Sequence, residues 1–242
     1  MIILIFKRIY LDKLFYLFLL IIILTGSFNN FILYFILLLI HELGHAIVGI
    51  ILGYKLNKIT FYPYGGITTF NYPINIPLKN ELLILIMGPI FQIIGYFILK
   101  NFYTNIYLYH YTLLIFNLLP IYPLDGGKIL NIICGYIFNY LKSLYITFII
   151  SIIFMIIVII YNTYNFNLNL ILMIFIMFIK LLNIYKKRYY YYNRFLLERY
   201  LYNYNFKKLK IINNDKCFFR DRKHIINFQE EKRYLKKLFK KY

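Results

Sequence analysis

The chain has 242 residues, of which 62% are hydrophobic and 15% are charged, and its formal net charge is +19. Soluble domains are about 45–50% apolar, so this composition excludes an ordinary soluble protein and indicates an integral membrane protein. The two cysteines, Cys134 and Cys217, form no CxxC pair, so neither a disulfide framework nor a thiolate metal site is indicated.

Six apolar segments are long enough to cross a membrane if some of the spans are short or interrupted. They cover about residues 9–24, 31–53, 81–99, 104–120, 141–161 and 166–183. The first segment lacks a small-residue cleavage site, so we expect a span there and not a signal peptide. Lysine and arginine concentrate in alternate connections, and the opposite connections contain only Lys100. The positive-inside rule therefore places both termini in the cytoplasm.

The second segment contains the sequence His-Glu-Leu-Gly-His at residues 41–45. Residues four apart lie on the same face of a helix, so His41 and His45 are placed to bind one metal ion with Glu42 beside them. Ionisable side chains are costly at bilayer depth, which marks this group as a functional site. A single buried histidine is usually a satisfied core residue, but the pair with its glutamate favours hydrolytic metal chemistry inside the membrane.

Residues 54–80 are too polar and too rich in Gly and Pro to be a span. Within them, residues 59–70 place β-forming residues on both sides of Pro63 and Gly65-Gly66, which predicts two short strands. Irregular backbone at membrane depth is tolerated only where protein or a water-filled cavity satisfies it. We therefore expect a membrane-associated β-hairpin after the second span.

A second interruption follows the fourth span, where residues 117–127 read Asn-Leu-Leu-Pro-Ile-Tyr-Pro-Leu-Asp-Gly-Gly. The two prolines end a helix, and Gly126-Gly127 lets the backbone approach closely whatever Asp125 faces. Asp125 therefore lies at the end of an apolar span, and the break in the helix allows its side chain to point into the protein.

A catalytic zinc ion takes three protein ligands and leaves a fourth position for water, so the two histidines need one more ligand. Between residues 31 and 185 the acids are Glu42, Glu81 and Asp125. Glu42 is better placed as the general base, and Glu81 is expected at the membrane interface beside a lysine. The remaining histidines are weaker candidates because of their places in the outer half of span four (His110) and in the tail (His224). Elimination predicts Asp125 as the third Zn²⁺ ligand.

The C-terminal residues 186–242 contain 18 of the 28 Lys and Arg residues and five acids. No nucleic-acid-binding motif accompanies this charge, so we expect no nucleic-acid partner and a cytoplasmic extension beside the anionic lipid bilayer. The predicted organisation is a membrane domain over residues 1–185 and a basic cytoplasmic tail over residues 186–242. Within the tail we expect a strand between Cys217 and Ile226 and a short basic helix from residue 230 to 242. The fold class is an all-α polytopic membrane protein with about six transmembrane helices and one hairpin.

Together these motifs resemble the site-2 family of intramembrane zinc proteases. The resemblance is closer still to its sporulation subgroup, the stage IV sporulation protein FB family. That subgroup has a similar Y-G-G hairpin, a P-L-K-x-E segment (residues 77–81) before a G-P motif (Gly88-Pro89), and R-F-L-L-E-R-Y (residues 194–200) after the last span. The similarity extends from about residue 30 to residue 200.

The resemblance implies a role for each matching residue. It implies that His41, His45 and Asp125 bind zinc and that Glu42 is the general base. Asn117 matches a family asparagine that orients the substrate or the oxyanion, although a helix C-cap is an equal alternative from the residues alone. The hairpin is implied to bind the substrate as an added strand, with its turn formed by Tyr64, Gly65 and Gly66.

The resemblance also implies a substrate and a location. Members of the sporulation subgroup remove the pro-sequence of an inactive, membrane-associated sigma-factor precursor in the mother-cell membrane around the forespore, under inhibitory membrane partners. This chain is therefore expected to be a zinc metalloendopeptidase of a bacterial cell membrane. Relatives often end in a CBS domain that senses nucleotide, but only about 38 residues follow Tyr204 here. This length is short even for one CBS repeat, so we expect a shortened or absent CBS domain in the tail.

Three alternatives remain open. A site-2 protease with a different biological role would cleave an anti-sigma factor or a remnant signal peptide. The chain has no PDZ-like insertion between its spans of the kind that the larger regulatory members carry. A transporter would use broken helices and buried charges to line a pathway, but it would show repeat-related interruptions, and these two differ. An inactive relative kept as a scaffold would have lost a ligand or the base, and neither is lost here.

Overall fold

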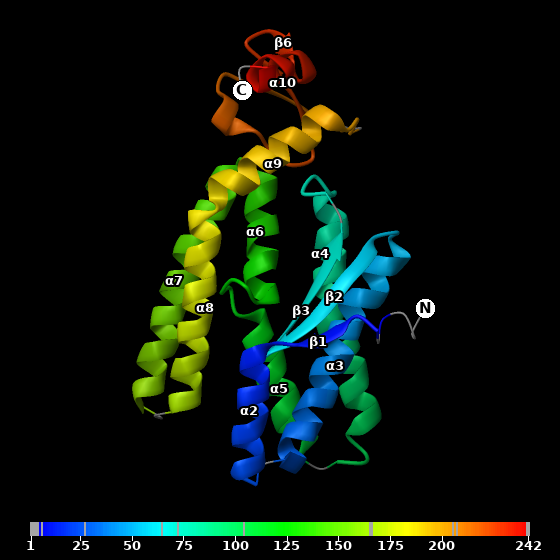
Figure 1. The fold of residues 1–242 in the computed structure, drawn as a ribbon, viewed down its shortest axis with the longest axis vertical. Helices are drawn as coiled ribbons and strands as arrows, with labels where there is room; N and C mark the ends of the chain where they lie inside the picture. Colours follow the sequence, from blue (N-terminus) through cyan, green and yellow to red (C-terminus); the bar gives the residue numbers. More distant parts are fainter. Residues whose placement is uncertain are drawn as a thin grey trace. The chain divides into compact units, whose positions relative to one another are not determined.

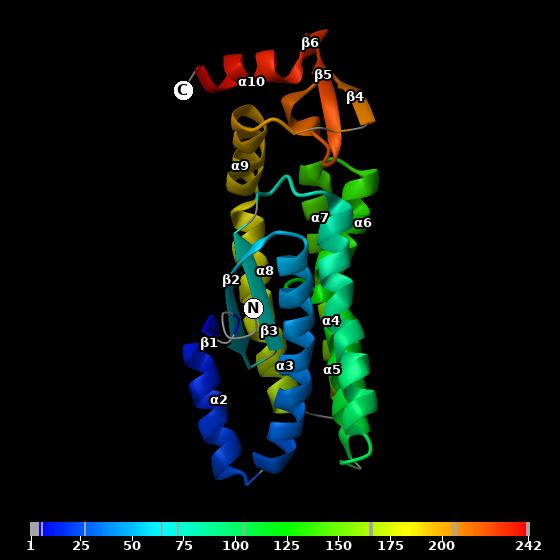
Figure 2. The same cartoon turned by 90° about the vertical axis from the view of Figure 1, so that its right-hand side faces the viewer.

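The computed structural model describes residues 5–240 except 6, 27, 64, 72, 104, 165, 166, 205 and 207. The chain divides into two compact units, one of residues 1–72 with 82–119 and the other of residues 73–81 with 120–242. Helices dominate both units, and each contains one small sheet (Figures 1 and 2).

The first unit combines apolar helices with a three-stranded sheet. Its helices are α2 (Lys13–Leu24), α3 (Phe28–Ile51), α5 (Ile106–Leu118) and the larger part of α4 (Leu78–Leu99). Its strands are β1 (Ile9–Leu11), β2 (Lys55–Tyr62) and β3 (Gly65–Asn71). The strand order is β1-β2-β3, with β1 parallel and β3 antiparallel to β2. Figure 1 shows the sheet lying across the helices of this unit.

The two strands of the expected β-hairpin are present as β2 and β3 and are longer than predicted, while the membrane association of the hairpin stays a prediction. Phe61 pairs with Gly66 and Tyr62 with Gly65 at the closed end. Gly65 adopts a φ of 146°, a region that side chains other than glycine rarely occupy. Tyr64, which we assigned to the substrate-binding turn, lies outside the described residues.

The start of the first predicted span is wrong by a few residues. Residues 9–11 form strand β1, and helix α2 begins only at Lys13. Asp12 separates the two elements, because its carboxylate accepts a hydrogen bond from the Leu14 N–H at 3.3 Å and its own N–H donates to the Phe61 carbonyl at 3.0 Å. A short acidic side chain at a helix start satisfies an amide that the helix leaves unpaired, so it ends the strand and begins the helix.

The apolar core of the first unit is largely aromatic. Phe61 of β2 is fully buried and its ring lies 5.0 Å from that of Phe35 on α3, while Phe15 of α2 contacts both. Each buried aromatic ring of this size stabilises a fold by roughly 1.5–3 kcal/mol. The sheet is therefore fixed to α2 and α3 by the side chains that face them.

The second unit contains the remaining helices and a second small sheet. Its helices are α6 (Asp125–Ile137), α7 (Tyr140–Tyr164), α8 (Leu168–Lys186), α9 (Arg188–Leu201) and α10 (Glu231–Lys240). Its other elements are β4 (Lys208–Ile212), the short 3-10 helix η1 (Asp215–Cys217), β5 (Arg222–Ile226) and β6 (Gln229–Glu230). Strand β5 lies between β4, to which it is parallel, and β6, to which it is antiparallel. In Figure 1, α7 and α8 run side by side and α9 continues from α8 toward α10.

The basic C-terminal segment has its own apolar core. Phe195 on α9, Phe218, Ile226 on β5 and Leu235 on α10 are each completely buried and belong to one cluster, together with Tyr140. The predicted basic helix is confirmed as α10, and the predicted strand is confirmed over Arg222–Ile226 as β5, whereas Cys217 belongs to η1. The many charged residues of this segment therefore lie on the surface of a folded element and do not indicate an extended chain.

Three helices are long and apolar enough to cross a membrane within the part of the chain that the structure describes: residues Asn30–Ile51, Leu78–Leu99 and Tyr140–Tyr164. These correspond to the second, third and fifth predicted spans. Helices α2, α5 and α8 occupy the places of the other three, but they are shorter or fall outside that set. A multi-helix membrane protein is thus supported, and the count of six crossings stays a prediction.

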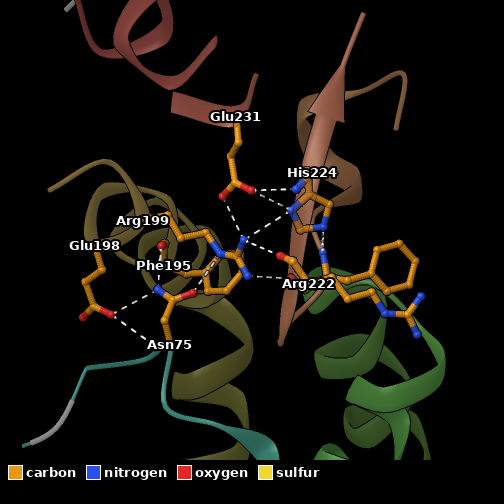
Figure 3. Close-up of polar contacts among 8 residues, drawn as sticks. Asn75, Phe195, Glu198, Arg199, Arg222, His224 and Glu231 are labelled. Atoms are coloured by element: carbon orange, nitrogen blue, oxygen red, sulfur yellow. Dashed lines mark hydrogen bonds and ion pairs between the residues drawn. The ribbon is translucent and has the colours of Figure 1, made fainter. Parts of the chain in front are cut away.

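A buried polar network joins α9, β5 and α10 (Figure 3). The Phe219 N–H donates to His224 Nε2 at 3.0 Å, which leaves the hydrogen of the neutral ring on Nδ1, 3.2 Å from a carboxylate oxygen of Glu231. Arg199 pairs with the other oxygen of Glu231 at 2.8 Å. Burial lowers the pKa of His224, with the cations Arg199 and Arg222 adding to the effect against the opposing influence of Glu231.

The pKa of Glu231 is also lowered. Burial alone would raise it, but the hydrogen bond from His224 and the charge and hydrogen bond of Arg199 outweigh that effect. A lowered pKa means that the unfolded segment binds protons that the folded one does not, so stability falls as the pH falls. For His224 the loss begins near its ordinary pKa of about 6.5, and for Glu231 it follows at lower pH.

We expect acidification from pH 7.5 to pH 5.5 to loosen the C-terminal segment, because protonation of His224 at Nε2 breaks its bond from Phe219. Limited proteolysis of the detergent-solubilised protein, with the cuts mapped by mass spectrometry, measures this. A His224→Gln variant, which does not titrate in this range, serves as the control. Equal pH dependence in both proteins would contradict the assignment.

Candidate metal centre

Helix α3 brings His41 and His45 together on one buried face. The exposed fraction is 0% for His41 and 4% for His45, and their Nε2 atoms lie 3.2 Å apart. Glu42 is buried beside them, and the ligand atoms of all three residues lie within 4.8 Å of one another. This is the arrangement that the i, i+4 spacing predicts for a metal-binding helix.

The Nδ1 atoms of both histidines face acceptors on α4. His41 Nδ1 lies 3.0 Å from Gln92 Oε1, and His45 Nδ1 lies 2.8 Å from the carbonyl oxygen of Ile84. Gln92 is oriented in turn because its Nε2 donates to the His110 carbonyl at 2.9 Å. A carbonyl oxygen accepts and never donates, so each histidine donates its Nδ1–H and presents the lone pair of Nε2 toward the other ring.

This donor set fits a zinc ion. With Zn–N distances of about 2.0–2.1 Å and tetrahedral angles, two imidazole nitrogens on one zinc stand about 3.3 Å apart, which is close to the observed separation of 3.2 Å. Hydrogen bonds from the second ring nitrogen to protein acceptors are the usual support of zinc-binding histidines. The ring orientations required for metal binding are therefore built into α3 and α4.

Two glycines make room for the site. A Cβ atom at Gly88 on α4 would lie 2.2 Å from His45 Cε1, and one at Gly66 on β3 would lie 2.4 Å from Glu42 Cγ. Both distances are far below van der Waals contact, so any side chain at these positions would displace a functional group. Close packing against His45 and Glu42 thus explains why the G-P motif and the hairpin have glycine at Gly88 and Gly66.

The hairpin also contacts the side chain of Glu42 directly. The hydroxyl of Thr68 on β3 donates to Glu42 Oε2 at 2.6 Å. This contact fixes the position of one carboxylate oxygen of Glu42 and leaves Oε1 on the other side of the group. It also places the hairpin edge next to the predicted base.

Asn117 lies in the last turn of α5 and is 5% exposed. A Cβ at Gly65 would stand 3.8 Å from its Oδ1, so the asparagine reaches the closed end of the hairpin. Its Nδ2 group donates no hydrogen bond among the described residues, although a buried amide normally does. The C-cap of α5 is Leu119, so capping of the helix does not account for Asn117.

Asp125 belongs to the second unit and is the first residue of α6. Its carboxylate is buried and pairs with Lys128 Nζ at 3.1 Å. The loop before it is held by Ser151, whose Oγ accepts from the Tyr122 N–H at 3.0 Å and donates to the Pro120 carbonyl at 3.3 Å. A Cβ at Gly127 would meet backbone atoms at 2.5 Å, which explains the glycine after the aspartate.

The structure therefore brings together, within the first unit, His41, Glu42 and His45 with the hairpin glycines and Asn117. Sequence reasoning missed Gln92 and Thr68. Gln92 carried a readable signal, because an amide in the middle of an apolar span is costly unless it has partners. Thr68 carried none, since threonine is an ordinary strand residue.

Comparisons with known proteins give consistent matches. Residues 29–106 and 96–161 match the model of Peptidase family M50. The chain is 29% identical over 189 residues to stage IV sporulation protein FB of Bacillus subtilis and 40% identical over 149 residues to zinc metalloprotease MJ0392 of Methanocaldococcus jannaschii. These alignments include 73% and 53% of this chain, and the chain spans 66% and 43% of the two relatives' lengths.

A solved structure has the same fold. The site-2 protease from Methanocaldococcus jannaschii superposes with a TM-score of 0.59 at 32% sequence identity. The superposition covers 74% of this chain and 91% of that chain.

We predict that Gln92→Leu weakens zinc binding by about 10–100-fold, because His41 loses the acceptor that fixes its ring. Zinc affinity of the purified protein, measured by competition with a chromogenic chelator, tests this. Thr112→Val on α5 is the control, since among the described residues the Thr112 hydroxyl donates to the Leu108 carbonyl of its own helix. Unchanged affinity in Gln92→Leu would rule out this role.

Proposed function

Because the chain belongs to peptidase family M50, we propose that it is a zinc metalloprotease that hydrolyses a peptide bond of a membrane-associated protein. The matches to known proteins confirm the predicted site-2 protease family and the metalloprotease class that the HELGH motif predicts. The observation that carries the proposal is the pair of Nε2 atoms 3.2 Å apart beside the buried Glu42. The family match leaves the transporter alternative without support.

Three residues would hold the metal: His41, His45 and Asp125. Support for Asp125 comes from its burial at the start of α6, after a loop fixed by Ser151, and from the scarcity of other acids in the apolar part of the chain. When bound, zinc would polarise the scissile carbonyl and activate a water molecule. Three protein ligands would leave one coordination position for that water.

Glu42 is the general base of the proposed reaction. Its Oε2 accepts from Thr68, which leaves Oε1 to take the proton of the attacking water. The same carboxyl then gives a proton to the departing amine as the peptide bond breaks. Asn117, buried at the closed end of the hairpin with an amide group available, orients the substrate or the oxyanion.

The substrate binds as an extended strand along β3. A transmembrane helix hides its amides in its own hydrogen bonds, so it must unwind before attack, and pairing with a strand edge replaces the bonds that are lost. Strand β3 is at the edge of its sheet, and its Gly66 and Thr68 contact Glu42. Gly65 and Gly66, which pair with Tyr62 and Phe61 at the closed end of the hairpin, lie where this surface reaches the base.

In the cell, residues 1–185 form the membrane protease domain with six crossings, and residues 186–242 form a basic tail on the cytoplasmic side with both termini. The similarity to stage IV sporulation protein FB supports a role in sporulation. The proposed substrate is accordingly the pro-sequence of a sigma-factor precursor at the mother-cell membrane, with inhibitory membrane partners. An anti-sigma factor or a remnant signal peptide is the alternative substrate.

Glu42→Gln is expected to lower cleavage by about 10²–10⁴-fold, the usual contribution of a general base, while zinc content stays at the wild-type level. The assay is coexpression with the sigma-factor precursor of the same genome, followed by immunoblotting for the shortened product. Glu230→Gln, which removes an exposed carboxylate from the tail, is the control. Cleavage by Glu42→Gln at the wild-type rate would exclude Glu42 as the base.

Asp125→Ala is expected to lose bound zinc as well as activity, because two imidazoles alone make an incomplete site. Metal analysis of the purified protein by mass spectrometry measures this directly and needs no substrate. Glu230→Ala is the matched control for removal of a carboxylate. Full zinc occupancy in Asp125→Ala would show that the third ligand is another group.

A further inference from the structure

Two motifs have no part in the proposed site, namely residues 77–81 and residues 194–200. One buried polar network in the second unit connects a residue next to the first motif with residues of the second motif (Figure 3). Asn75, in the connection between β3 and α4, is 4% exposed, and Glu198 and Arg199 on α9 are 8% and 3% exposed. Polar groups that are buried to this degree persist only where their hydrogen bonds are made.

The contacts of this network hold the connection tightly. Glu198 Oε2 accepts from the backbone N–H groups of Ile74 at 2.6 Å and Asn75 at 3.3 Å. The Asn75 side chain donates to the Phe195 carbonyl at 2.9 Å and accepts from Arg199 Nε at 2.8 Å. Arg199 continues to Glu231, so the connection, α9 and α10 share one set of bonds.

The segment of residues 218–222, which runs from the end of η1 to the first residue of β5, reaches the start of α4. Asp221 Oδ2 accepts from the Leu78 N–H at 2.7 Å, so a carboxylate 143 residues away in sequence satisfies the first amide of α4. Arg220 pairs with Glu81 at 2.5 Å and donates to the Ile76 carbonyl at 3.3 Å. A negative charge at a helix N-terminus is stabilising, and here the tail supplies it.

The same segment contacts the junction of α6 and α7. The Tyr140 N–H, at the start of α7, donates to the Phe218 carbonyl at 2.9 Å. Arg222 donates to the Tyr136 carbonyl, near the end of α6, at 3.0 Å. Residues 218–222 are therefore bonded both to the first turn of α4 and to the last turn of α6.

We propose that residues 218–222 are a positioning element for the metal site, with Arg220 and Asp221 as its positioning residues. Helix α4 supplies the Ile84 carbonyl and Gln92 that orient the two histidines, and α6 begins with Asp125. One segment of the tail thus holds the ends of both helices on which the three ligands depend. This inference rests on the proposed function insofar as Asp125 shares the metal with His41 and His45.

In this proposal the tail acts on the reaction through α4 and α6. Glu198, Arg199 and Arg220 of the tail are buried against the connection and the first turn of α4. A change in the docking of the tail therefore changes the geometry of α4, and the reverse also holds. A protein that binds the tail would alter cleavage through the ends of α4 and α6. The basic tail of residues 186–242 is in this sense a support of the metal site that the protease domain of residues 1–185 contains.

The test is a charge exchange between Arg220 and Glu81. The single variants Arg220→Glu and Glu81→Arg should each lower zinc affinity and the cleavage rate at saturating precursor by at least about tenfold. Both should also speed amide hydrogen exchange at residues 78–81, measured by mass spectrometry. The double variant, which restores an ion pair, should return all three quantities to within about threefold of wild type. Arg233→Glu, the same charge change on the exposed face of α10, is the control and should change none of them.

Two results would overturn the proposal. One is faster exchange at residues 78–81 in the single variants with zinc affinity and cleavage unchanged, which would make the segment merely structural. The other is a double variant that remains as defective as the singles. If the wild-type chain cleaves no precursor, the proposed function fails, while zinc affinity and exchange still decide whether residues 218–222 position the site.

Discussion

The two hydrogen bonds that fix the histidine rings are the contacts on which the remainder of the molecule depends. They run from His41 to Gln92 and from His45 to the Ile84 carbonyl, and both acceptors belong to α4. An apolar helix has no water to orient imidazole rings, so a neighbouring helix has to supply the acceptors. The close approach of α3 to α4 at Gly44 and Gly88 follows from this need, since side chains there would meet the opposing helix.

The hairpin completes the site from the other side. Thr68 and Gly66 contact Glu42, and Gly65 lies beside Asn117. In the proposed function the strand that would bind the substrate also holds Glu42, so recognition and chemistry would depend on the same few backbone positions. The aromatic core under β2 keeps those positions rigid.

Much of this arrangement was predictable from the residues. The HELGH spacing fixes one helical face by geometry alone, and the Pro63-to-Gly66 segment fixes a turn, so the histidine pair and the hairpin were found. Strand β1 was not predicted, because three apolar residues before Asp12 read equally well as the start of a span. Contacts such as that of Asp221 with Leu78 were also beyond prediction. They join residues 143 apart, and no local pattern encodes such a pairing.

The order of the first sheet has one more consequence. Strand β1 covers the outer side of β2 over Ile59 to Phe61, so along that stretch β3 provides the sheet's other border among the described residues. Strand β1 in turn has an outer edge of three residues, and β3 has one of seven. Because β1 occupies the edge of β2 along Ile59 to Phe61, a peptide that adds to the sheet beside Glu42, as the proposed function requires, pairs with the outer edge of β3.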